Sequence, residues 1–496
     1  MSDIYIPGVR SRLNSEKIVE DLMKLERVPI QRAEQTIVRY ETERAYWQDV
    51  AVRTTALRES ARQLFSFQNP FNERSINSSD ESIITGTATR ESSEQLLNFT
   101  VKQLAQADRL LSKPVEENFQ VESGNYTFTI GKDEITFDFR GGTLKEFSDT
   151  LNRRNQGKIQ SSLIAVRSGT RSLLIESKIP GEDNRLVFSG ASLALGEKIG
   201  MVSAVYDDNN TLVDVKPLNA VSSAKDAVLS MEGIEIYRSG NEIDDLIPGV
   251  TISLKGVSDR PVTLQVEPNT ESIKDSIITM VGNYNRLMAE LNILTRNDST
   301  VINELTYLTR EEKDAYSERL GAFSGDSTLM QIRNGLLRIV TSPHDTSDEY
   351  DLSLLAQIGI STDIRMGGGV DASRLRGYLD IDPKVLDSAI ASNLPAIKQL
   401  FAYDSTGDLL ADSGVAYSID RLVRPYVETG GLFAQKTSTM SSRIDQEKRR
   451  IETLDRQLLA KEADLKKQYS MMEGAYARME QMSSSFDRFQ QQNSPR

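Results

Sequence analysis

Few side chains in this sequence are of the types that perform acid–base or nucleophilic chemistry. The only histidine is His344, which is followed by Asp345, and the 496 residues contain no cysteine. The pair could be a general base with its orienting carboxylate, but neighbouring side chains rarely face each other, and no G-x-S-x-G nucleophile segment is present. Because Ser342 and Pro343 precede the histidine, a surface turn explains it better.

Two carboxylates at a spacing of two residues are the best remaining candidates for chemistry. Asp380 and Asp382 lie just before Pro383 and would share one face of a short extended segment. A carboxyl pair can serve as acid and base in a hydrolysis reaction. A strand end followed by a helix cap explains the pair more simply, because aspartate before proline is a strong start for a helix. We therefore expect a structural role.

Other features argue against the main classes of ligand. The glycines at 367–369 lack the spacing and the following Lys-Ser or Lys-Thr of a phosphate-binding loop, so they predict a flexible loop. A net charge of −13 lacks the basic footprint that nucleic-acid binding needs. The absence of cysteine excludes thiolate nucleophiles, cysteine-bound zinc and disulfides. We expect no catalytic residue, cofactor, metal or nucleic-acid partner.

The sequence also argues against membrane insertion and against a cleaved secretory signal. No run of apolar residues reaches the roughly 18 that a membrane helix needs. The first 17 residues, MSDIYIPGVRSRLNSEK, contain no apolar core of the kind found in such signals. We therefore expect a cytoplasmic protein, or one exported by a route that does not use a cleaved signal.

The elements that would hold these residues change in type along the chain. A helix with Ile18, Leu22 and Leu25 on its apolar face comes first, and Pro29 should interrupt it. Alternating β-branched and aromatic residues at 126–130 predict a strand in a β-rich middle. Helix returns from about residue 272. This order predicts an α+β, multidomain protein.

The tail, from about residue 440 to 492, has the strongest periodicity in the chain. One heptad position is always apolar, whereas the position three residues later includes Glu447, Lys461 and Gln468. The pattern predicts an imperfect coiled coil, and an amphipathic helix packed on its own domain is the alternative. The apolar position is occupied by Ile444, Ile451, Leu458, Leu465, Met472, Met479 and Phe486.

Short segments with distinctive composition follow one another along almost the whole chain. They are IPGVRSRLN at 6–14, IVEDLMKLE at 18–26, FTVKQLAQA at 99–107, DAVLSMEG at 226–233, NEIDDLIPGVTISL at 241–254, YNRL at 284–287, GDSTL at 325–329 and GYLDID at 377–382. In this order they resemble the flagellar filament-cap proteins, the hook-associated FliD family. Arg12 stands where that family usually has glycine, and Asn14 where it has aspartate. A co-linear series is far more specific than any one short motif.

The resemblance implies a structural cap at the distal tip of a bacterial flagellar filament, exported and not an enzyme. Its partners would be further copies of itself in a ring, flagellin, the flagellar export apparatus and a cytoplasmic chaperone at the C-terminal helix. Ile18, Leu22, Leu25 and the apolar tail positions would make the leg, filament and oligomer contacts. The family's signature residues would be structural: Asn241, Ile243, Gly249, Thr251, Tyr284, Asn285 and Asp326.

The expected architecture has helical, coiled-coil terminal legs and a helical body, with β-rich head domains inserted. The expected divisions are 1–45 with 440–496 for the legs, 46–75 with 270–439 for the body, 76–113 with 222–269 for one head domain and 114–221 for a variable second one. Two alternatives stay open. Another axial flagellar protein, such as a junction protein, would lack the 241–254 segment, and a surface adhesin would need an anchor or a signal.

Overall fold

The computed structural model describes residues 15–155, 157–209, 211–303, 305, 308–347, 349–362, 376–408 and 410–492. The expected turn before residue 15 and the glycines at 367–369 lie outside these ranges. The chain forms two compact units, one from residues up to Asn69 together with those from Ile273 onward, and one from Pro70–Ser272. Helical terminal segments and an inserted β-rich segment confirm the expected α+β class. The finer division into four domains stays a prediction.

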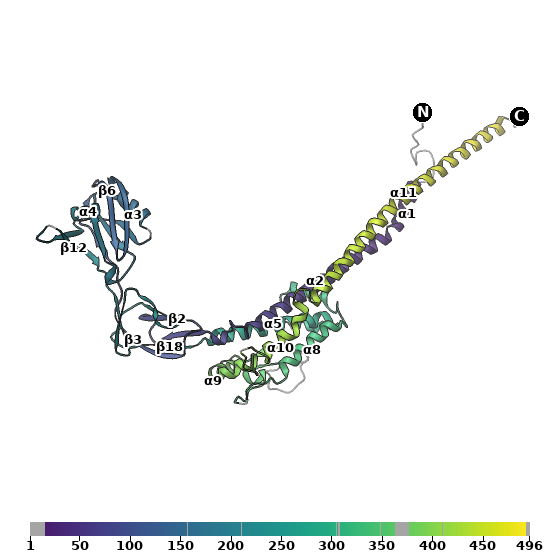
Figure 1. The fold of residues 1–496 in the computed structure, drawn as a ribbon. Coiled ribbons are helices and arrows are strands. Elements are labelled where there is room, and N and C mark those ends of the chain that lie inside the picture. The colour runs from purple at the N-terminus through teal and green to yellow at the C-terminus, as the bar shows by residue number, and fades with distance from the viewer. Residues whose placement is uncertain are drawn as a thin grey trace. The chain divides into compact units, whose positions relative to one another are not determined.

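The first unit is mostly helical in its described length (Figure 1). Pro29 lies in the first turn of α2, where its missing N–H costs nothing, and α1 ends just before it, as expected. The C-terminal helix has 61 residues, which corresponds to about 90 Å at 1.5 Å per residue. The helices are α1 (Ser15–Glu26), α2 (Val28–Gln63), α5 (Thr270–Thr295), α6 (Thr300–Asn303), α7 (Arg310–Arg319), α8 (Ser327–Thr341), α9 (Pro383–Phe401), α10 (Val415–Val427) and α11 (Leu432–Gln492).

The core of this unit contains large buried side chains from α2 and α5. Trp47, the only tryptophan, is 2% exposed and stacks on Phe323 with ring centroids 4.7 Å apart. Tyr284 and Leu287 of α5 are fully buried, as is Leu57 of α2. Burial of such large side chains is the main favourable term that holds these helices together.

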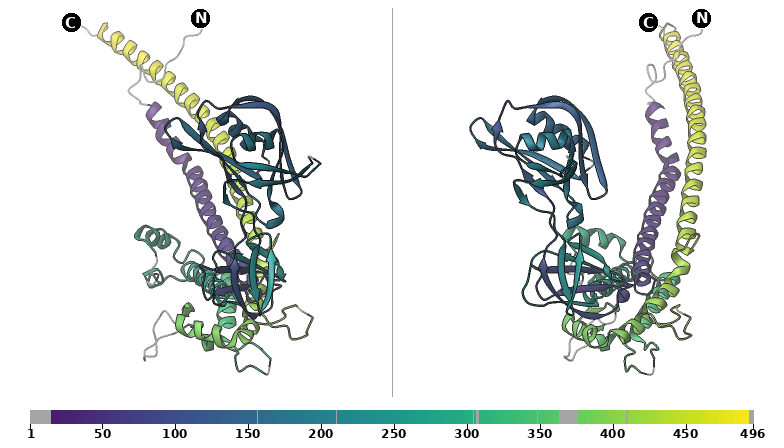
Figure 2. Two further views of the ribbon diagram at one scale, coloured as in Figure 1. Left: turned by 90° about the vertical axis from the view of Figure 1, so that its left-hand side faces the viewer. Right: turned by 60° about the vertical axis from the view of Figure 1, so that its left-hand side comes forward.

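The two N-terminal helices, α1 and α2, pack along α11, as Figures 1 and 2 show. Val19 and Met23 of α1 and Ile30 of α2 are buried with Leu458 of α11. Four partly buried residues of α11 pack against this cluster: Ile451, Leu454, Leu465 and Tyr469. One polar seam position is explained by an ion pair across the helices, in which Lys461 lies 2.6 Å from Glu26.

The expected apolar face of α1 is wrong in part. Leu22 is 36% exposed and Leu25 is 69% exposed, and Ile18 is only half-buried. The helix has two apolar rows side by side, and the row through Val19 and Met23 turns toward α11 instead. Spacing alone identifies both rows but not the one that meets the partner helix.

The second unit contains two separate β cores. The first is built from two sheets, in the orders β1-β18-β3-β14-β15 and β16-β17-β2. Its centre is Phe99, Val101, Leu229 and Ile252, all fully buried. The strands are β1 (Arg74–Ser78), β2 (Ile84–Ala88), β3 (Gln95–Gln103), β14 (Ala227–Met231), β15 (Ile234–Arg238), β16 (Glu242–Ile247), β17 (Val250–Leu254) and β18 (Val262–Pro268).

The second β core is inserted between β3 and β14. Its aromatic centre is Tyr126, Phe128, Phe147 and Phe188, and the ring centroids of Tyr126 and Phe147 lie 4.8 Å apart. Its elements are β4 (Arg109–Leu111), β5 (Val115–Glu116), β6 (Gln120–Ile130), β7 (Asp133–Thr143), α3 (Leu144–Arg154), β8 (Ile159–Arg167), β9 (Thr170–Ser177), β10 (Leu186–Gly190), α4 (Ala191–Lys198), β11 (Val202–Tyr206), β12 (Leu212–Pro217) and β13 (Ala220–Ser222).

A buried carboxylate holds the chain where it enters and leaves this inserted part. Asp108 is 2% exposed, and its carboxylate accepts hydrogen bonds from the backbone N–H groups of Leu186 and Ala224, each at 2.7 Å. Its carbonyl accepts a third from the N–H of Ser177 at 2.8 Å. Charge-assisted bonds of this kind are stronger than neutral ones, so Asp108 fastens three segments at one point.

Candidate functional site

The first residue of the 241–254 segment, Asn241, is hydrogen-bonded to a part of the chain that is distant in sequence. The Asn241 side chain accepts a hydrogen bond from the Ala105 N–H at 2.8 Å and donates one to the Ala105 carbonyl at 2.9 Å. Two of the segments that carry the resemblance, 99–107 and 241–254, therefore meet through this asparagine. Its own carbonyl accepts a bond from the N–H of Leu254 at 2.8 Å.

The neighbouring signature residues have structural roles in the same β core. Gly249 has φ of 75°, and a Cβ there would lie 2.6 Å from the Thr89 hydroxyl oxygen, so only glycine fits this turn. Ile243 is 1% exposed. Thr251 pairs with Thr87 across β17 and β2.

Replacing Asn241 with alanine should loosen the first β core. The change leaves the N–H and C=O of Ala105 unpaired, and each unsatisfied group costs about 1–3 kcal/mol. Native-state hydrogen exchange should show a faster-exchanging Ala105 amide. Asn98→Ala is the control, since that side chain only joins the surface groups of Glu232 and Thr263. Equal protection of the Ala105 amide in both variants would contradict this role.

The signature residues of the helical unit also serve to position backbone. The hydroxyl of Tyr284, whose burial raises its pKa, donates to the Gly377 carbonyl at 3.0 Å. Asn285 donates to the Leu379 carbonyl at 2.7 Å and accepts from the Leu379 N–H at 2.8 Å. This asparagine fixes the 377–382 segment against α5, just as Asn241 fixes the 99–107 segment.

Asp326 is the N-cap of α8. Its carboxylate accepts hydrogen bonds from the N–H groups of Thr328 and Leu329 at 2.9 and 3.1 Å. Lys436 of α11 lies 3.4 Å from the same carboxylate. The aspartate thus satisfies two free donors of the helix start and joins α8 to α11.

Asp380 and Asp382, the carboxylate pair considered for catalysis, have two different structural roles. Asp382 caps α9 by accepting from the N–H groups of Lys384 and Val385 at 3.0 and 3.2 Å. Asp380 is exposed and pairs with Ser361 in the short ladder of β19 (Ile360–Ser361) and β20 (Asp380–Ile381). This arrangement agrees with the strand end and helix cap that the sequence favours.

His344 likewise has a local partner. One ring nitrogen lies 2.8 Å from the Ile339 carbonyl, near the C-terminal end of α8, and the backbone N–H of His344 donates to the Ser353 carbonyl at 2.8 Å. Histidine at this place satisfies a carbonyl that the helix end leaves free.

The resemblance to filament-cap proteins implies a role in filament assembly, and His344→Ala should leave that assembly unchanged. The lost side-chain bond is a single contact at a helix end, worth about 0.5–1.5 kcal/mol. Filament length and cell motility measure the outcome. Loss of motility with normal folding and secretion of the variant would reveal a functional role for this residue.

Two of the buried carboxylates in the described part of the helical unit, Glu290 and Asp420, belong to charge clusters that have no distinctive sequence motif. Glu290 of α5 is 1% exposed and lies 3.2 Å from both Arg53 and Arg319. Burial raises its pKa, against the opposing effect of the two arginines. Arg319 also lies 2.6 Å from Asp49. The cluster joins α2, α5 and α7.

Asp420 of α10 forms the second buried cluster. It is fully buried and accepts a bond from Arg58 of α2 at 2.8 Å. Arg424, one turn further along α10, pairs with the same carboxylate. Only the spacing of Asp420 and Arg424 could be noticed in the sequence, because Arg58 lies far away along the chain.

The described residues contain neither a metal cluster nor a membrane helix. No group of three or more acidic, histidine or cysteine side chains in the described ranges could hold a metal ion. In the same part of the chain, no helix is long and apolar enough to cross a membrane.

The remaining candidate for function is the surface of the long terminal helices. Of the predicted contact residues, Ile444 and Leu458 are buried, and Ile451 and Leu465 are half-buried. Further along α11 the apolar side chains are exposed. They are Met471, Met472, Tyr476, Met479, Met482 and Phe486, with exposed fractions of 44–73%.

Comparison with known proteins identifies the family. Residues 11–108 match the family model for the N-terminus of flagellar hook-associated protein 2, and residues 224–481, more than half of the chain, match the model for its C-terminus. The chain belongs to the flagellar hook-associated protein 2 family. This confirms the expected relationship to filament-cap proteins. The stretch between the two matches contains most of the inserted β core, which lies in the region expected to form the variable second head domain.

Relatives in this family align along nearly their whole length. Flagellar hook-associated protein 2 of Treponema maltophilum is 30% identical and covers 92% of this chain and 94% of its own. The A-type protein of Pseudomonas aeruginosa is 28% identical over 96% of this chain and 95% of its own. The D1-D2-D3 domains of the Escherichia coli flagellar cap protein FliD share the fold, with a TM-score of 0.54, 22% identity, and coverage of 80% of this chain and 99% of that one.

Proposed function

We propose that the protein is a structural cap at the distal end of a bacterial flagellar filament, and not an enzyme. It promotes ordered polymerisation of exported flagellin and prevents flagellin from leaking away. Membership of the flagellar hook-associated protein 2 family, through matches at both ends of the chain, is the observation that carries this proposal.

The terminal helices are suited to act as legs on the filament. Packing of α1 and α2 along α11 uses one apolar row, which leaves Leu22 and Leu25 exposed. Together with Met472, Met479 and Phe486 on α11, these side chains offer apolar area to flagellin or to a neighbouring copy. Each buried CH₂ group contributes about 0.8 kcal/mol, so a leg can be held firmly without a covalent or nucleotide-driven step.

The proposal includes the partners and the location of the protein. Copies of the chain assemble into a ring at the filament tip, with the β-rich unit as head and the helical unit as body and legs. Flagellin folds beneath the ring, and its burial of apolar surface supplies the free energy for each step. The chain leaves the cell through the flagellar export apparatus, and a cytoplasmic chaperone binds the C-terminal helix before export.

Deletion of the gene for this chain tests the proposal. Cells without the protein should secrete flagellin into the medium as monomer and bear no long filaments, and expression of the wild-type chain should restore them. Immunoblots of medium and of sheared filaments give the two amounts. Normal filaments without the protein would overturn the cap function. Filaments of normal length with lost surface adhesion would favour the adhesin alternative.

A further inference from the structure

One strand of the inserted β core has an open side. β8 pairs with β9 along one side only, and no other described strand pairs with it. At its start this open side is covered by α3. The Ser161 N–H donates to the Asn152 side chain at 2.7 Å, and Asn152 donates to the Ser161 carbonyl at 2.8 Å.

The rest of the open side has no such cover. The backbone N–H and C=O groups in an antiparallel ladder alternate between the two sides of a strand. The N–H and C=O groups of Leu163 and Ala165 therefore point to the same open side as those of Ser161. No strand in the described part of the chain meets them there. The neighbouring Ile164 and Val166 are 42% and 47% exposed. An exposed apolar edge of this kind is a template for another strand.

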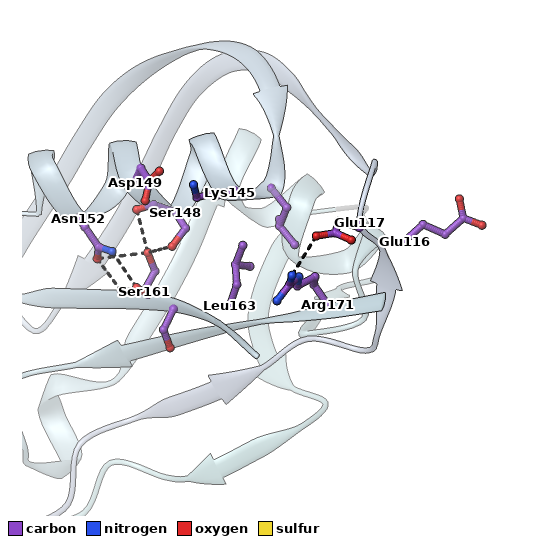
Figure 3. Close-up of a pocket in the computed structure, with 11 residues that line it drawn as sticks. Glu116, Glu117, Lys145, Ser148, Asp149, Asn152, Ser161, Leu163 and Arg171 are labelled. Carbon is purple, nitrogen blue, oxygen red and sulfur yellow. Dashed lines mark hydrogen bonds and ion pairs between the residues drawn. The ribbon is translucent and has the colours of Figure 1, made fainter. Parts of the chain in front are cut away.

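A groove runs beside this edge, between α3 and β8 (Figure 3). It encloses about 320 Å³. Ser161 points toward Ser148 and Asn152 at one end, and Arg171 points toward Glu117 at the other, with Leu163 between them. The serine–asparagine group is already satisfied by its own hydrogen bonds. An edge strand beside a helix is the arrangement that other domains use to accept an added strand.

The same core also carries an element suited to be that strand. Among the described strands, β11 and β12 pair only with each other, and a two-stranded hairpin is marginally stable by itself. Its side chains Tyr206, Leu212 and Val213 are 52%, 41% and 65% exposed. The outer side of β12 meets no other described strand.

We propose that β12 of one copy pairs with the open edge of β8 in the next copy. The inference rests on the proposed self-assembly and names its head contact. Figure 1 shows β12 and α3 on different sides of the inserted core, so a single copy does not satisfy both surfaces. Such a head-to-tail contact forms a closed ring when the rotation between copies closes.

Charge supports this pairing. The hairpin turn carries Asp207 and Asp208, whereas β8 ends at the exposed Arg167. The groove itself is lined by carboxylates as well as by Lys145, so the complementary charge on this side is that of Arg167. The opposite charges of Arg167 and of the hairpin turn favour one register of pairing.

Cross-linking of the full-length protein tests the contact, because the chain has no native cysteine. The variant with Ala165→Cys and Val213→Cys, treated with a short bismaleimide, should give a ladder of covalent multimers on a denaturing gel. Either substitution alone should give no ladder, because the thiol then has no partner thiol across the contact and one thiol per chain can join at most two chains. The control joins Ala165→Cys with Val221→Cys, a residue on β13 that is 53% exposed, and should give no ladder.

Native mass spectrometry of the same samples separates two failures. Oligomers without a ladder would overturn the β8–β12 contact and leave the ring in place. Monomers at every concentration would overturn both the contact and the self-assembly on which it rests. Loss of the cross-link when flagellin is added would assign the groove to flagellin instead.

A backbone variant tests the strand pairing itself. Ala165→Pro removes the outward N–H without breaking the ladder to β9, since prolines are tolerated on strand edges. It should weaken self-association about tenfold relative to Ala165→Val, the value expected for a lost hydrogen bond at the contact. Sedimentation velocity measures the dissociation constants, and equal values for the two variants would overturn the pairing.

Discussion

Aspartate at both Leu458 and Leu465 is expected to abolish filament growth and to release flagellin into the medium. Leu458 is 8% exposed and packs on Val19, Met23 and Ile30, with Leu465 partly buried beside them. Loss of a buried leucine side chain costs about 2–5 kcal/mol, and an unpaired buried charge adds to this. The terminal helices should separate, while the β-rich unit, which contributes nothing to this seam, stays folded.

The next residue along the helix provides a matched control. Leu459 is 66% exposed, so Leu459→Asp introduces the same charge without entering the seam. Hydrogen exchange of α1 should increase in the double variant and stay unchanged in the control. If the double variant grows filaments of normal length, the paired helices are not the leg that holds the cap.

Asp420→Ala should destabilise the helical unit by about 3–5 kcal/mol, the usual cost of removing one partner from a buried ion pair. The change leaves Arg58 with its side chain only 21% exposed and without the fully buried carboxylate that neutralises it. Trp47, the only tryptophan, is buried in the same unit. Its fluorescence during guanidinium unfolding therefore reports on this unit.

Asp387→Ala is the matched comparison, since this aspartate is also paired, with Lys274 at 2.6 Å, but is 55% exposed. Exposed ion pairs contribute about 0–1 kcal/mol. The two variants should differ clearly in their unfolding midpoints. Similar midpoints would mean that the Asp420 cluster contributes no more than a surface pair.

Local patterns in the sequence predicted the elements well, and physical chemistry explains why. Pro29, expected to interrupt the first helix, lies in the first turn of α2, just after α1 ends, and Asp382 caps α9 as expected. The strand expected at 126–130 lies within β6. Caps, prolines and alternation act over a few residues, so a short window contains all the information they need.

Contacts between distant segments were harder to predict. The row of α1 that meets α11 was assigned to Leu22 and Leu25, because both rows of the helix are apolar and only the partner decides between them. The signature residue Asn241 could be recognised by resemblance, but its partner Ala105 could not. The Glu290 cluster draws on three helices and left no local pattern.

The helical unit is discontinuous in sequence, and this sets an order of events during folding. The β-rich unit is one continuous stretch, so all its strands are present as soon as residue 272 is available. In contrast, α1 and α2 pack on α11, which begins at Leu432. Contacts of such long separation form late. A chain delivered end first therefore cannot complete its terminal helical pair until both ends have arrived, so the proposed leg would assemble only after delivery is finished.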